Sequence, residues 1–473
     1  MAISRAPDKT AQESADERVT APNPPATRRP RNISPEHFID WFQSVTPYIH
    51  AFRGRTFVIA FGGEVVSEGK FVGLNHHLNL LAALGVRLVV VHGARAQIDA
   101  RLRELGHATS YVRGLRVTDD VTLSCAKETS GRLRVEIEAM LSMGLPNSPM
   151  AGADIRVSSG NFVTAKPIGI LDGVDLQHTG EVRKIDVAAI RDRLNFGELV
   201  LLSPLGFSAT GEVFNIALEN IAEAAAVALN ADKLIFMMDK PGVTNRRGSL
   251  QRELTPNQAQ KLIAKDGSLD GDTGLYLPCA VRACQQGVKR VHLISRHTPG
   301  ALLLELFTHT GVGTMVSPDP METLRDAKID DIGGVVRLIE PLEEDGTLVK
   351  RGRDLLEREI GRFVVMEHDR MIVACAALYP FSEDRAAELA CLAVNPEFRG
   401  RGAGVRLLEA IEARARRRGF KKLFVLTTRA EHWFVEHGFV ESGVDELPRG
   451  KREMYNYQRR SVVLTKKLRA GSA

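Results

Sequence analysis

Short apolar runs alternate with amphipathic stretches over the first two thirds of the chain. The runs predict buried strands at 57–61, 87–92, 199–203, 233–239 and 290–295. Apolar residues at helical spacing predict helices between them, at 73–84, 96–105, 120–143 and 217–229. Fully apolar strands joined by helices are typical of a parallel sheet that helices cover on both faces. We therefore expect a three-layer α/β domain with a mainly parallel sheet.

An amphipathic helix precedes the first of these strands. Ser34 and Pro35 are typical of a helix start, because Ser caps free amides and Pro is tolerated in the first turn. Phe38 and Phe42 then follow at helical spacing. Residues 1–32 differ, since they contain no apolar run and many Ala, Pro, Thr, Arg and acidic residues. We expect a disordered tail there, with neither a signal peptide nor a transit peptide.

The segment around Pro318 and Pro320 breaks the α/β pattern, and we place a linker at 316–326. The first domain then spans 33–315 with its N-terminal helix, and a smaller second domain spans 327–473. In the second domain we expect a helix at 330–340 and strands at 362–367, 371–378, 387–394 and 422–427. This mixed order predicts a smaller α+β domain.

Composition narrows the class of protein. The chain has 473 residues, of which 44% are hydrophobic and 26% charged, with a formal net charge of +5. This balance is globular, and the charge is too small to argue for nucleic-acid binding. No apolar stretch approaches the ~18 residues of a membrane-spanning helix. The five cysteines have no paired CxxC spacing, which favours reduced thiols in a cytoplasmic protein.

The most informative segment of the second domain is Arg399-Gly-Arg-Gly-Ala-Gly404, between a predicted strand and a predicted helix. Glycines let several backbone amides converge, and a helix N-terminus adds partial positive charge, so such a loop binds phosphate or pyrophosphate. A dinucleotide-binding fingerprint would need an acidic residue at the end of the next strand, where Leu426 and Thr427 stand instead. The Gly-Lys-Ser/Thr of a P-loop is also absent.

This loop resembles the acetyl-CoA loop of GNAT-type N-acetyltransferases, Arg/Gln-x-x-Gly-x-Gly/Ala. The resemblance implies that loop amides hold the CoA pyrophosphate and that the preceding strand end pairs with the pantetheine arm. The residues that it assigns to acetyl-CoA are Leu392, Ala393, Val394, Arg399, Gly400, Arg401, Gly402, Ala403, Gly404 and Val405. Many members of that family have a Tyr as proton donor where this chain has Phe434, so we assign the donor to Thr427 on the neighbouring strand.

The first domain resembles the amino-acid kinase fold over residues 55–316, acetylglutamate kinase in particular. Matching stretches include 89–93 and 239–243. Two features of the kinase are missing. Ala60 stands in place of the Lys before the first Gly-Gly, and Gly93-Ala-Arg-Ala96 stands in place of a Gly-Gly-Gly-Pro loop. Phosphoryl transfer needs cations and closely packed amides around the developing charge, so we predict no kinase activity.

A degenerate kinase-like domain joined to an acetyltransferase domain resembles bacterial N-acetylglutamate synthase. The resemblance implies direct transfer of acetyl from acetyl-CoA to the α-amino group of L-glutamate, the first step of arginine synthesis, without a metal. Glu388 would act as the base, because the amino group of free glutamate is protonated near neutral pH. Arginine forks suit the two carboxylates of the acceptor. The residues assigned to glutamate are Arg351, Cys391, Leu426, Lys451 or its neighbour Arg452, Arg459 and Ser461.

In the family that the chain resembles, the kinase-like domain binds L-arginine, which inhibits the synthase. The resemblance places Tyr48, Glu305 and Gly311 around the arginine. The carboxylate of Glu305 is a suitable partner for a guanidinium group. The N-terminal helix at 34–50 is typical of arginine-sensitive members and implies a homo-oligomer, expected to be a hexameric ring.

Three alternatives stay open at this point. A bifunctional synthase would keep acetylglutamate kinase activity, which Ala60 argues against. A non-catalytic arginine sensor would bind arginine but release no CoA in the presence of glutamate. An acetyltransferase for protein lysines is disfavoured by the several cations that suit a small dicarboxylate.

Overall fold

The structure is a computed structural model that describes residues 34–144, 148–245, 247–266, 269, 271–308, 310–318, 322–368, 371–400 and 402–468. The predicted tail at 1–32 and Arg401 of the glycine loop lie outside the described residues. Residues 319–321 of the predicted linker lie outside them as well. The chain forms two compact units, Met1–Pro47 and Tyr48–Ala473.

The predicted N-terminal helix is confirmed as α1 (Pro35–Phe52). The amide of Phe38 donates to the carbonyl of Ser34 over 3.1 Å, so the helix begins where the sequence has Ser followed by Pro. Phe38 and Phe42 lie one turn apart and stack, with ring centroids separated by 6.0 Å. Both rings are about half exposed. The first unit therefore carries an aromatic stripe along one face of this helix.

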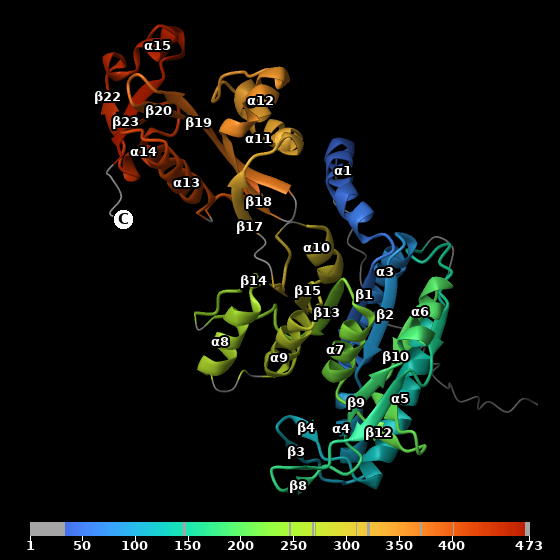
Figure 1. The fold of residues 1–473 in the computed structure, drawn as a ribbon. Helices are drawn as coiled ribbons and strands as arrows, with labels where there is room; N and C mark the ends of the chain where they lie inside the picture. The colour runs from blue at the N-terminus through green and yellow to red at the C-terminus, as the bar shows by residue number, and fades with distance from the viewer. Residues whose placement is uncertain are drawn as a thin grey trace, which may run out of the picture. The chain divides into compact units, whose positions relative to one another are not determined.

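An eight-stranded sheet forms the centre of the N-terminal domain of the second unit (Figure 1). Its strand order is β14-β16-β15-β13-β1-β2-β10-β5. The strands are β1 (Thr56–Phe61), β2 (Arg87–His92), β5 (Val157–Ser159), β10 (Leu199–Leu202), β13 (Lys233–Met238), β14 (Glu253–Leu254), β15 (Arg290–Ser295) and β16 (Thr314–Val316). All neighbours are parallel except β15 and β16. The predicted mainly parallel sheet and its apolar strands are confirmed.

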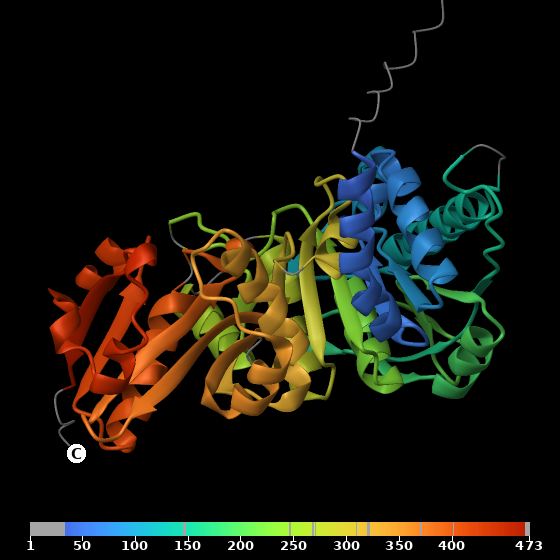
Figure 2. The ribbon, with the colours of Figure 1, turned by 90° about the horizontal axis from the view of Figure 1, so that it is seen from above.

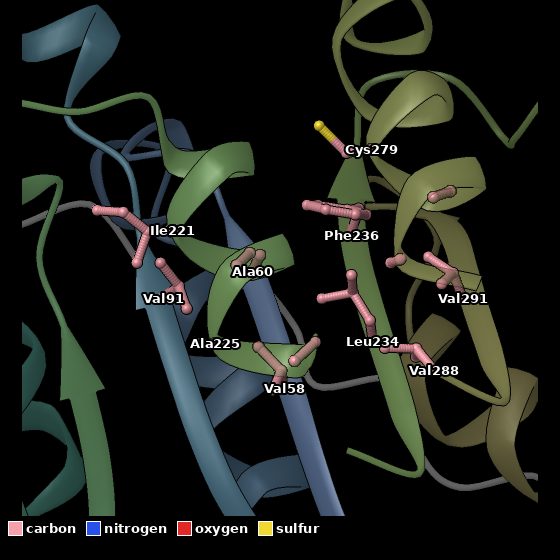
Figure 3. Packing of buried hydrophobic residues seen from close by; sticks show 14 of the residues in the cluster. Val58, Ala60, Val91, Ile221, Ala225, Leu234, Phe236, Cys279, Val288 and Val291 are labelled. Carbon is pink, nitrogen blue, oxygen red and sulfur yellow. The ribbon is translucent and has the colours of Figure 1, made fainter. Parts of the chain in front are cut away.

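Helices cover both faces of this sheet, as the continuous apolar strands require. They are α2 (Glu64–Ser67), α3 (Phe71–Ala83), α4 (Arg95–Glu104), α5 (Asp120–Leu141), α6 (Val187–Asn195), α7 (Leu218–Leu229), α8 (Pro256–Asp266), α9 (Asp272–Gln285) and α10 (Ala301–Phe307). Side chains of α7 and α9 pack on the face that carries Val58 and Ala60 (Figure 3). On the opposite face, Phe61 packs against Phe71 of α3 with ring centroids 5.4 Å apart.

The sequence analysis missed a second sheet, of four strands in the order β12-β11-β6-β9. Its strands are β6 (Val163–Pro167), β9 (Gly180–Ile185), β11 (Leu205–Phe207) and β12 (Val213–Asn215). It also missed the paired strands β3 (Tyr111–Val112) and β4 (Leu115–Arg116), and β7 (Ile170–Leu171) and β8 (Val174–Asp175). These strands are short, and β6 and β9 carry exposed polar residues such as Lys166 and Glu181. No continuous apolar run therefore marks them.

A seven-stranded sheet forms the C-terminal domain, in the order β17-β18-β19-β20-β21-β23-β22. Its strands are β17 (Glu322–Asp326), β18 (Phe363–His368), β19 (Met371–Phe381), β20 (Ala386–Val394), β21 (Lys422–Thr427), β22 (Val440–Ser442) and β23 (Val462–Lys467). All neighbours are antiparallel except β20 and β21. The predicted α+β character of this domain is confirmed.

Helices lie on both faces of this seven-stranded sheet as well. They are α11 (Ile332–Glu344), α12 (Arg353–Glu359), α13 (Ala403–Arg417), α14 (Glu431–Glu436) and α15 (Arg449–Arg452). Val335 and Ile339 of α11 belong to one core cluster, and Leu407 and Ile411 of α13 belong to another. The two clusters take alternate residues of β18 and β19, which face opposite sides of the sheet. Figure 2 shows this domain in orange and red.

None of the helices in the described part of the chain has both the length and the apolarity to cross a membrane. The five cysteines all lie among the described residues, and each is buried with a free thiol.

Candidate active site

Two neighbouring strands of the C-terminal sheet separate at Glu388. β20 pairs with β21 only from Ala386 to Glu388. Beyond that point β20 stays paired with β19 as far as Val394, while β21 stays paired with β23 as far as Thr427. An opening in the sheet therefore begins after Glu388, bordered by the end of β20 on one side and by the end of β21 on the other.

Cys391 distorts β20 beside this opening. Its φ is +52°, and the register between β19 and β20 shifts near it, as in a β-bulge. A bulge changes the direction of the backbone groups that follow, here those of 392–394. Burial raises the pKa of the Cys391 thiol to about 11, although the nearby Arg351 opposes this shift. The thiol is therefore protonated at neutral pH and is no nucleophile.

The glycine loop leads directly into α13. Gly400 and Gly402 have φ angles of +77° and +82°, in the left-handed region that residues with a side chain rarely adopt. Gly402 is the N-cap of α13, and no side chain of the described residues makes a capping hydrogen bond there. Its first backbone amides are thus free to bind an anion, and the helix dipole favours one there. Arg399 holds the loop to the strand end, because its Nε donates to the carbonyl of Val394 over 3.4 Å.

Gly404 lies in the first turn of α13, against an aromatic ring. A Cβ at this position would lie 3.3 Å from Cζ2 of Trp433. Trp433, on α14, stacks on His437 with ring centroids 4.3 Å apart. The absence of a side chain at Gly404 thus lets the start of α13 approach this ring closely, as a close-packed interior requires.

Thr427 ends β21 at the edge of the opening. Its hydroxyl oxygen accepts from the amides of Arg429 and Ala430, over 3.4 and 3.0 Å. These bonds use the oxygen lone pairs and leave the hydroxyl hydrogen to donate elsewhere. Phe434, in contrast, is buried in an apolar cluster and has no proton to give.

Glu388 lies between two aromatic residues and a cation. In the strand pairing it is opposite Tyr379 of β19 on one side and Phe424 of β21 on the other. Its side chain is 10% exposed, and its Oε2 lies 2.8 Å from Nζ of Lys451. The carboxylate is therefore buried at the point where the strands part, in an ion pair with α15.

Two arginines approach each other near Glu388. Burial lowers the pKa of Arg459, and the neighbouring charge of Arg351 lowers it further. Arg351 donates to the carbonyl of Val349 over 3.1 Å, and Arg459 donates to the carbonyls of 346–347. Neither guanidinium has a carboxylate partner among the described residues. The charge of Glu388 acts on Arg351, but a single carboxylate does not balance two guanidinium groups, so the pair makes a site for a further anion such as a carboxylate.

The sequence also assigned Ser461, Leu426 and either Lys451 or Arg452 to binding of the substrate glutamate. Ser461 is buried just before β23, and its carbonyl accepts from the hydroxyl of Tyr455 over 2.7 Å. Leu426 packs in the same small cluster as Tyr455. The two adjacent cations of α15 differ, since Lys451 reaches Glu388 whereas Arg452 donates to backbone carbonyls of 445–447. Arg452 therefore contacts the local backbone, whereas Lys451 contacts the predicted base.

The predicted arginine-site residues gather around α10. Glu305 accepts from Nδ1 of His292 over 2.8 Å and from the amides of Val312 and Gly313 over 2.7 and 2.8 Å. Burial raises the pKa of Glu305, but these bonds outweigh it and bring the pKa to about 2. Glu305 is therefore a buried carboxylate that organises the loop after α10.

Gly311 and Tyr48 both lie close to residues of α10, the helix that carries Glu305. Gly311 has a φ of +55°, and a Cβ there would come within 2.5 Å of the Glu305 carboxylate. The ring of Tyr48 packs edge-on against Phe307 of α10, with centroids 6.4 Å apart. All three residues that the sequence assigned to arginine are thus within one neighbourhood of the N-terminal domain.

A pocket lies at the carboxyl ends of β1 and β2 in the N-terminal domain. Its wall includes Gly62, Gly93 and Arg95. Arg95 donates to the carbonyl of Gly114 over 3.0 Å. Ala60 is buried in the apolar core and supplies no cation to the pocket (Figure 3). The absence of kinase activity stays a prediction. It is supported by β1, which contributes no lysine to the pocket.

The sequence analysis missed Tyr379. Its ring lies beneath both Arg351 and Arg362, with distances of 5.6 and 4.8 Å from each guanidinium carbon to the ring centroid. Its hydroxyl donates to Glu359 over 2.8 Å. Tyr379 thus holds Arg351 beside the opening by a cation–π contact. The only signal in the sequence is an aromatic residue with a polar tip at the end of an apolar strand.

These features define a class of protein, a GNAT-type acetyltransferase domain that follows an amino-acid-kinase-like domain. Residues 55–295 match the Amino acid kinase family, and residues 334–439 match the Acetyltransferase (GNAT) family. The two matches correspond to the sheet that carries Ala60 and to the sheet that opens at Glu388.

Relatives of the whole chain narrow the class further. An amino-acid acetyltransferase of Ralstonia nicotianae is 53% identical over 95% of this chain and 98% of its own length. N-acetylglutamate synthase from Neisseria gonorrhoeae, complexed with coenzyme A and L-arginine, has a TM-score of 0.80 at 37% identity, over 91% of this chain and 99% of that one. The same synthase complexed with coenzyme A and N-acetyl-glutamate has a TM-score of 0.58 at 38% identity, with the same coverage.

The chain belongs to the amino-acid acetyltransferase family, that of the N-acetylglutamate synthases. It is an amino-acid N-acetyltransferase whose cosubstrate is acetyl-CoA.

Proposed function

We propose that the acceptor is L-glutamate, so that the enzyme forms N-acetylglutamate at the opening between β20 and β21. The observation that carries this proposal is the pair Arg351 and Arg459, two neighbouring guanidinium groups without a carboxylate partner among the described residues. They suit the distal carboxylate of a dicarboxylic amino acid. The gonococcal synthase complexed with coenzyme A and N-acetyl-glutamate supports the same acceptor.

Acetyl-CoA would lie along the opening. The free amides at the start of α13, with Arg399 and its neighbours in the glycine loop, suit the pyrophosphate. The backbone of 392–394, redirected by the bulge at Cys391, would pair with the pantetheine arm and polarise the thioester carbonyl. Residues 400–405 complete this set, Arg401 among them although it lies outside the described residues.

The reaction would be a direct transfer. Glu388 removes a proton from the acceptor's ammonium group, the amine nitrogen bonds to the thioester carbon, and the carbon–sulfur bond then breaks. The departing thiolate takes a proton from the hydroxyl of Thr427, and the second proton that the nitrogen loses as the amide forms passes through water to restore that hydroxyl, so that the proton on Glu388 is the one released. No acyl-enzyme forms, because the pKa of Cys391, raised by burial to about 11, keeps that thiol protonated.

We further propose that L-arginine inhibits the enzyme through the N-terminal domain, at Tyr48, Glu305 and Gly311. The gonococcal synthase complexed with L-arginine supports this ligand. The domains would divide as predicted, with a regulatory part at 33–315, a linker at 316–326 and a catalytic part at 327–473. We expect a homo-oligomer in the cytoplasm, with a hexameric ring as the arrangement.

One assay tests these proposals together. CoA release from acetyl-CoA is followed with each common amino acid as acceptor, with and without L-arginine. We expect release with L-glutamate, much less with L-glutamine, and inhibition by L-arginine. Equal rates with glutamate and glutamine would overturn the dicarboxylate site. Arginine binding without any CoA release would favour a sensor instead.

A further inference from the structure

The carboxylate that we propose as the base already has a partner. Nζ of Lys451 lies 2.8 Å from Oε2 of Glu388. The Glu388 side chain is 10% exposed and that of Lys451 is 20% exposed. A pair that is shielded to this degree is a charge-assisted hydrogen bond and differs from a solvated surface contact. It joins the strand that borders the opening to α15.

This pair stands in the way of the chemistry. A general base must accept a proton from the reacting amine within hydrogen-bond distance. Here Oε2 already accepts from Lys451, and the positive charge of Lys451 repels the ammonium group of an acceptor that approaches Oε1. Moving the two charges apart with nothing in their place would leave a buried ammonium and a buried carboxylate uncompensated, which is strongly unfavourable. An anion must therefore take the ammonium of Lys451 when the base begins to act.

The acceptor carries a suitable anion. In an α-amino acid the α-carboxylate and the reacting amine are bonded to the same carbon. An α-carboxylate held by Lys451 would therefore bring the amine next to Glu388, because the two side chains are only 2.8 Å apart. Arg351 and Arg459 would remain for the distal carboxylate, since their hydrogen bonds in the described residues go to backbone carbonyls and, for Arg351, also to the hydroxyl of Tyr379.

We propose that Lys451 is a positioning residue that transfers from Glu388 to the α-carboxylate of the bound amino acid, so that acceptor binding frees the base. This inference rests on the proposed function, because it takes Glu388 as the base and the arginine pair as the distal site. It adds a rule for specificity. An amine without an α-carboxylate leaves Lys451 on Glu388 and is acetylated poorly even when its distal carboxylate is bound.

The test compares L-glutamate with its α-amide, isoglutamine, which keeps the amine and the distal carboxylate but has a neutral carboxamide in place of the α-carboxylate. In the unmodified enzyme we expect kcat with isoglutamine to be about 100-fold lower, within the range that a general base contributes. In Lys451→Met the base is free with either acceptor, so we expect the two kcat values to agree within about threefold. Lys451→Arg should restore the discrimination. Lys467→Met, on the exposed end of β23, should keep it in full.

Several results would overturn this proposal. One is an unmodified enzyme that acetylates isoglutamine with the same kcat as glutamate. A second is a Lys451→Met enzyme that keeps the full discrimination in kcat, or that changes only the KM for glutamate. If Lys451→Met does not fold, the isoglutamine measurement on the unmodified enzyme and the Lys451→Arg variant still decide. Failure of the unmodified enzyme to release CoA with glutamate would instead remove the proposed function, and this proposal with it.

Discussion

Tyr379 and Glu388 lie directly opposite each other on the antiparallel strands β19 and β20. Cross-strand neighbours point to the same face of a sheet, so both side chains face the side on which α11 packs. Arg351 lies over the ring of Tyr379, with 5.6 Å between its guanidinium carbon and the ring centroid. One strand pair thus presents the proposed base and positions one of the proposed substrate cations beside it.

Replacing Glu388 by Gln tests the proposed base. Gln keeps the size of the side chain but accepts no proton at neutral pH, so we expect kcat to fall about 100-fold to 10,000-fold. Binding of acetyl-CoA, measured by calorimetry, should stay within about threefold, because the glycine loop is unchanged. The exposed Glu441 of β22 offers a matched control, since Glu441→Gln should leave both values unchanged. Normal turnover in Glu388→Gln would assign the base elsewhere.

Replacing Arg459 by Ala tests the distal carboxylate site. A hydrogen bond to a charged group contributes about 2 kcal/mol, so we expect the KM for glutamate to rise about 30-fold. The KM for acetyl-CoA should change little. Arg460 is its exposed neighbour, and Arg460→Ala should leave the glutamate KM unchanged. An equal rise in both KM values for Arg459→Ala would contradict a role in acceptor binding.

Local patterns explain why much of this fold was predictable. Strands such as β2 and β15 are apolar on both faces, and their predicted bounds agree with the structure. The glycine loop was also evident, because Gly400 and Gly402 stand between an apolar strand and an amphipathic helix. Both signals are contained in fewer than about 20 consecutive residues, where periodicity and turn chemistry decide the structure.

Contacts between distant segments account for what sequence reasoning could not supply. No pattern connects Lys451 on α15 with Glu388 on β20, or Arg459 with Arg351. These neighbours depend on the register of the strands and on where each loop returns to the sheet. The contact between Tyr379 and Arg351 was missed for the same reason. The residues of the proposed site were thus named from the sequence and stay a prediction, whereas the ion pair between Lys451 and Glu388 needed the structure.

Replacing Gly404 by Val tests the approach of α13 to Trp433. A Cβ would already lie 3.3 Å from the ring, so the larger side chain must push either the ring or the first turn away. Overpacking of this kind costs about 1–3 kcal/mol, and we expect the KM for acetyl-CoA to rise about 10-fold. The glutamate KM should change little. Gly333→Ala in α11, where nothing lies within 4 Å of an added Cβ, is the control. An unchanged acetyl-CoA KM would show that this turn does not contribute to binding.

Replacing Glu305 by Gln tests the proposed arginine site. Gln still accepts from the amides of Val312 and Gly313, so the loop should keep its conformation, which Ala would not ensure. The lost charge should weaken the binding of arginine, so we expect the inhibitory concentration of arginine to rise about 10-fold to 100-fold. Activity without arginine should stay near normal. Glu128→Gln, on an exposed face of α5, should leave inhibition unchanged. Full inhibition of Glu305→Gln would place the regulatory site elsewhere.

The buried His92 should make the stability of the N-terminal domain depend on pH. Burial lowers the pKa of His92 to about 4, whereas an unfolded histidine titrates near 6.5. Between these values the unfolded chain binds the proton that the folded chain excludes, so the free energy of unfolding falls as the pH falls. The slope for one such group is about 1.4 kcal/mol per pH unit, and it vanishes above about pH 6.5 and below about pH 4.

His92→Gln isolates this contribution. Gln can still bond the hydroxyl of Ser203, which lies 2.9 Å from Nε2 of His92, but it does not titrate. Urea unfolding followed by circular dichroism at pH 7.5 and pH 5.5 gives the change in free energy of unfolding. Between pH 7.5 and pH 5.5 the free energy of unfolding should fall by about 1 kcal/mol less in the variant than in the unmodified chain. The reason is that the variant takes up one proton fewer when it unfolds. His76→Gln is the control. His76 is only half-buried on α3, so this variant also loses a histidine, but one that is still in contact with water. An identical pH dependence in His92→Gln and the unmodified chain would mean that His92 is protonated as readily in the folded domain as in the unfolded chain, and that the buried end of β2 tolerates the charge.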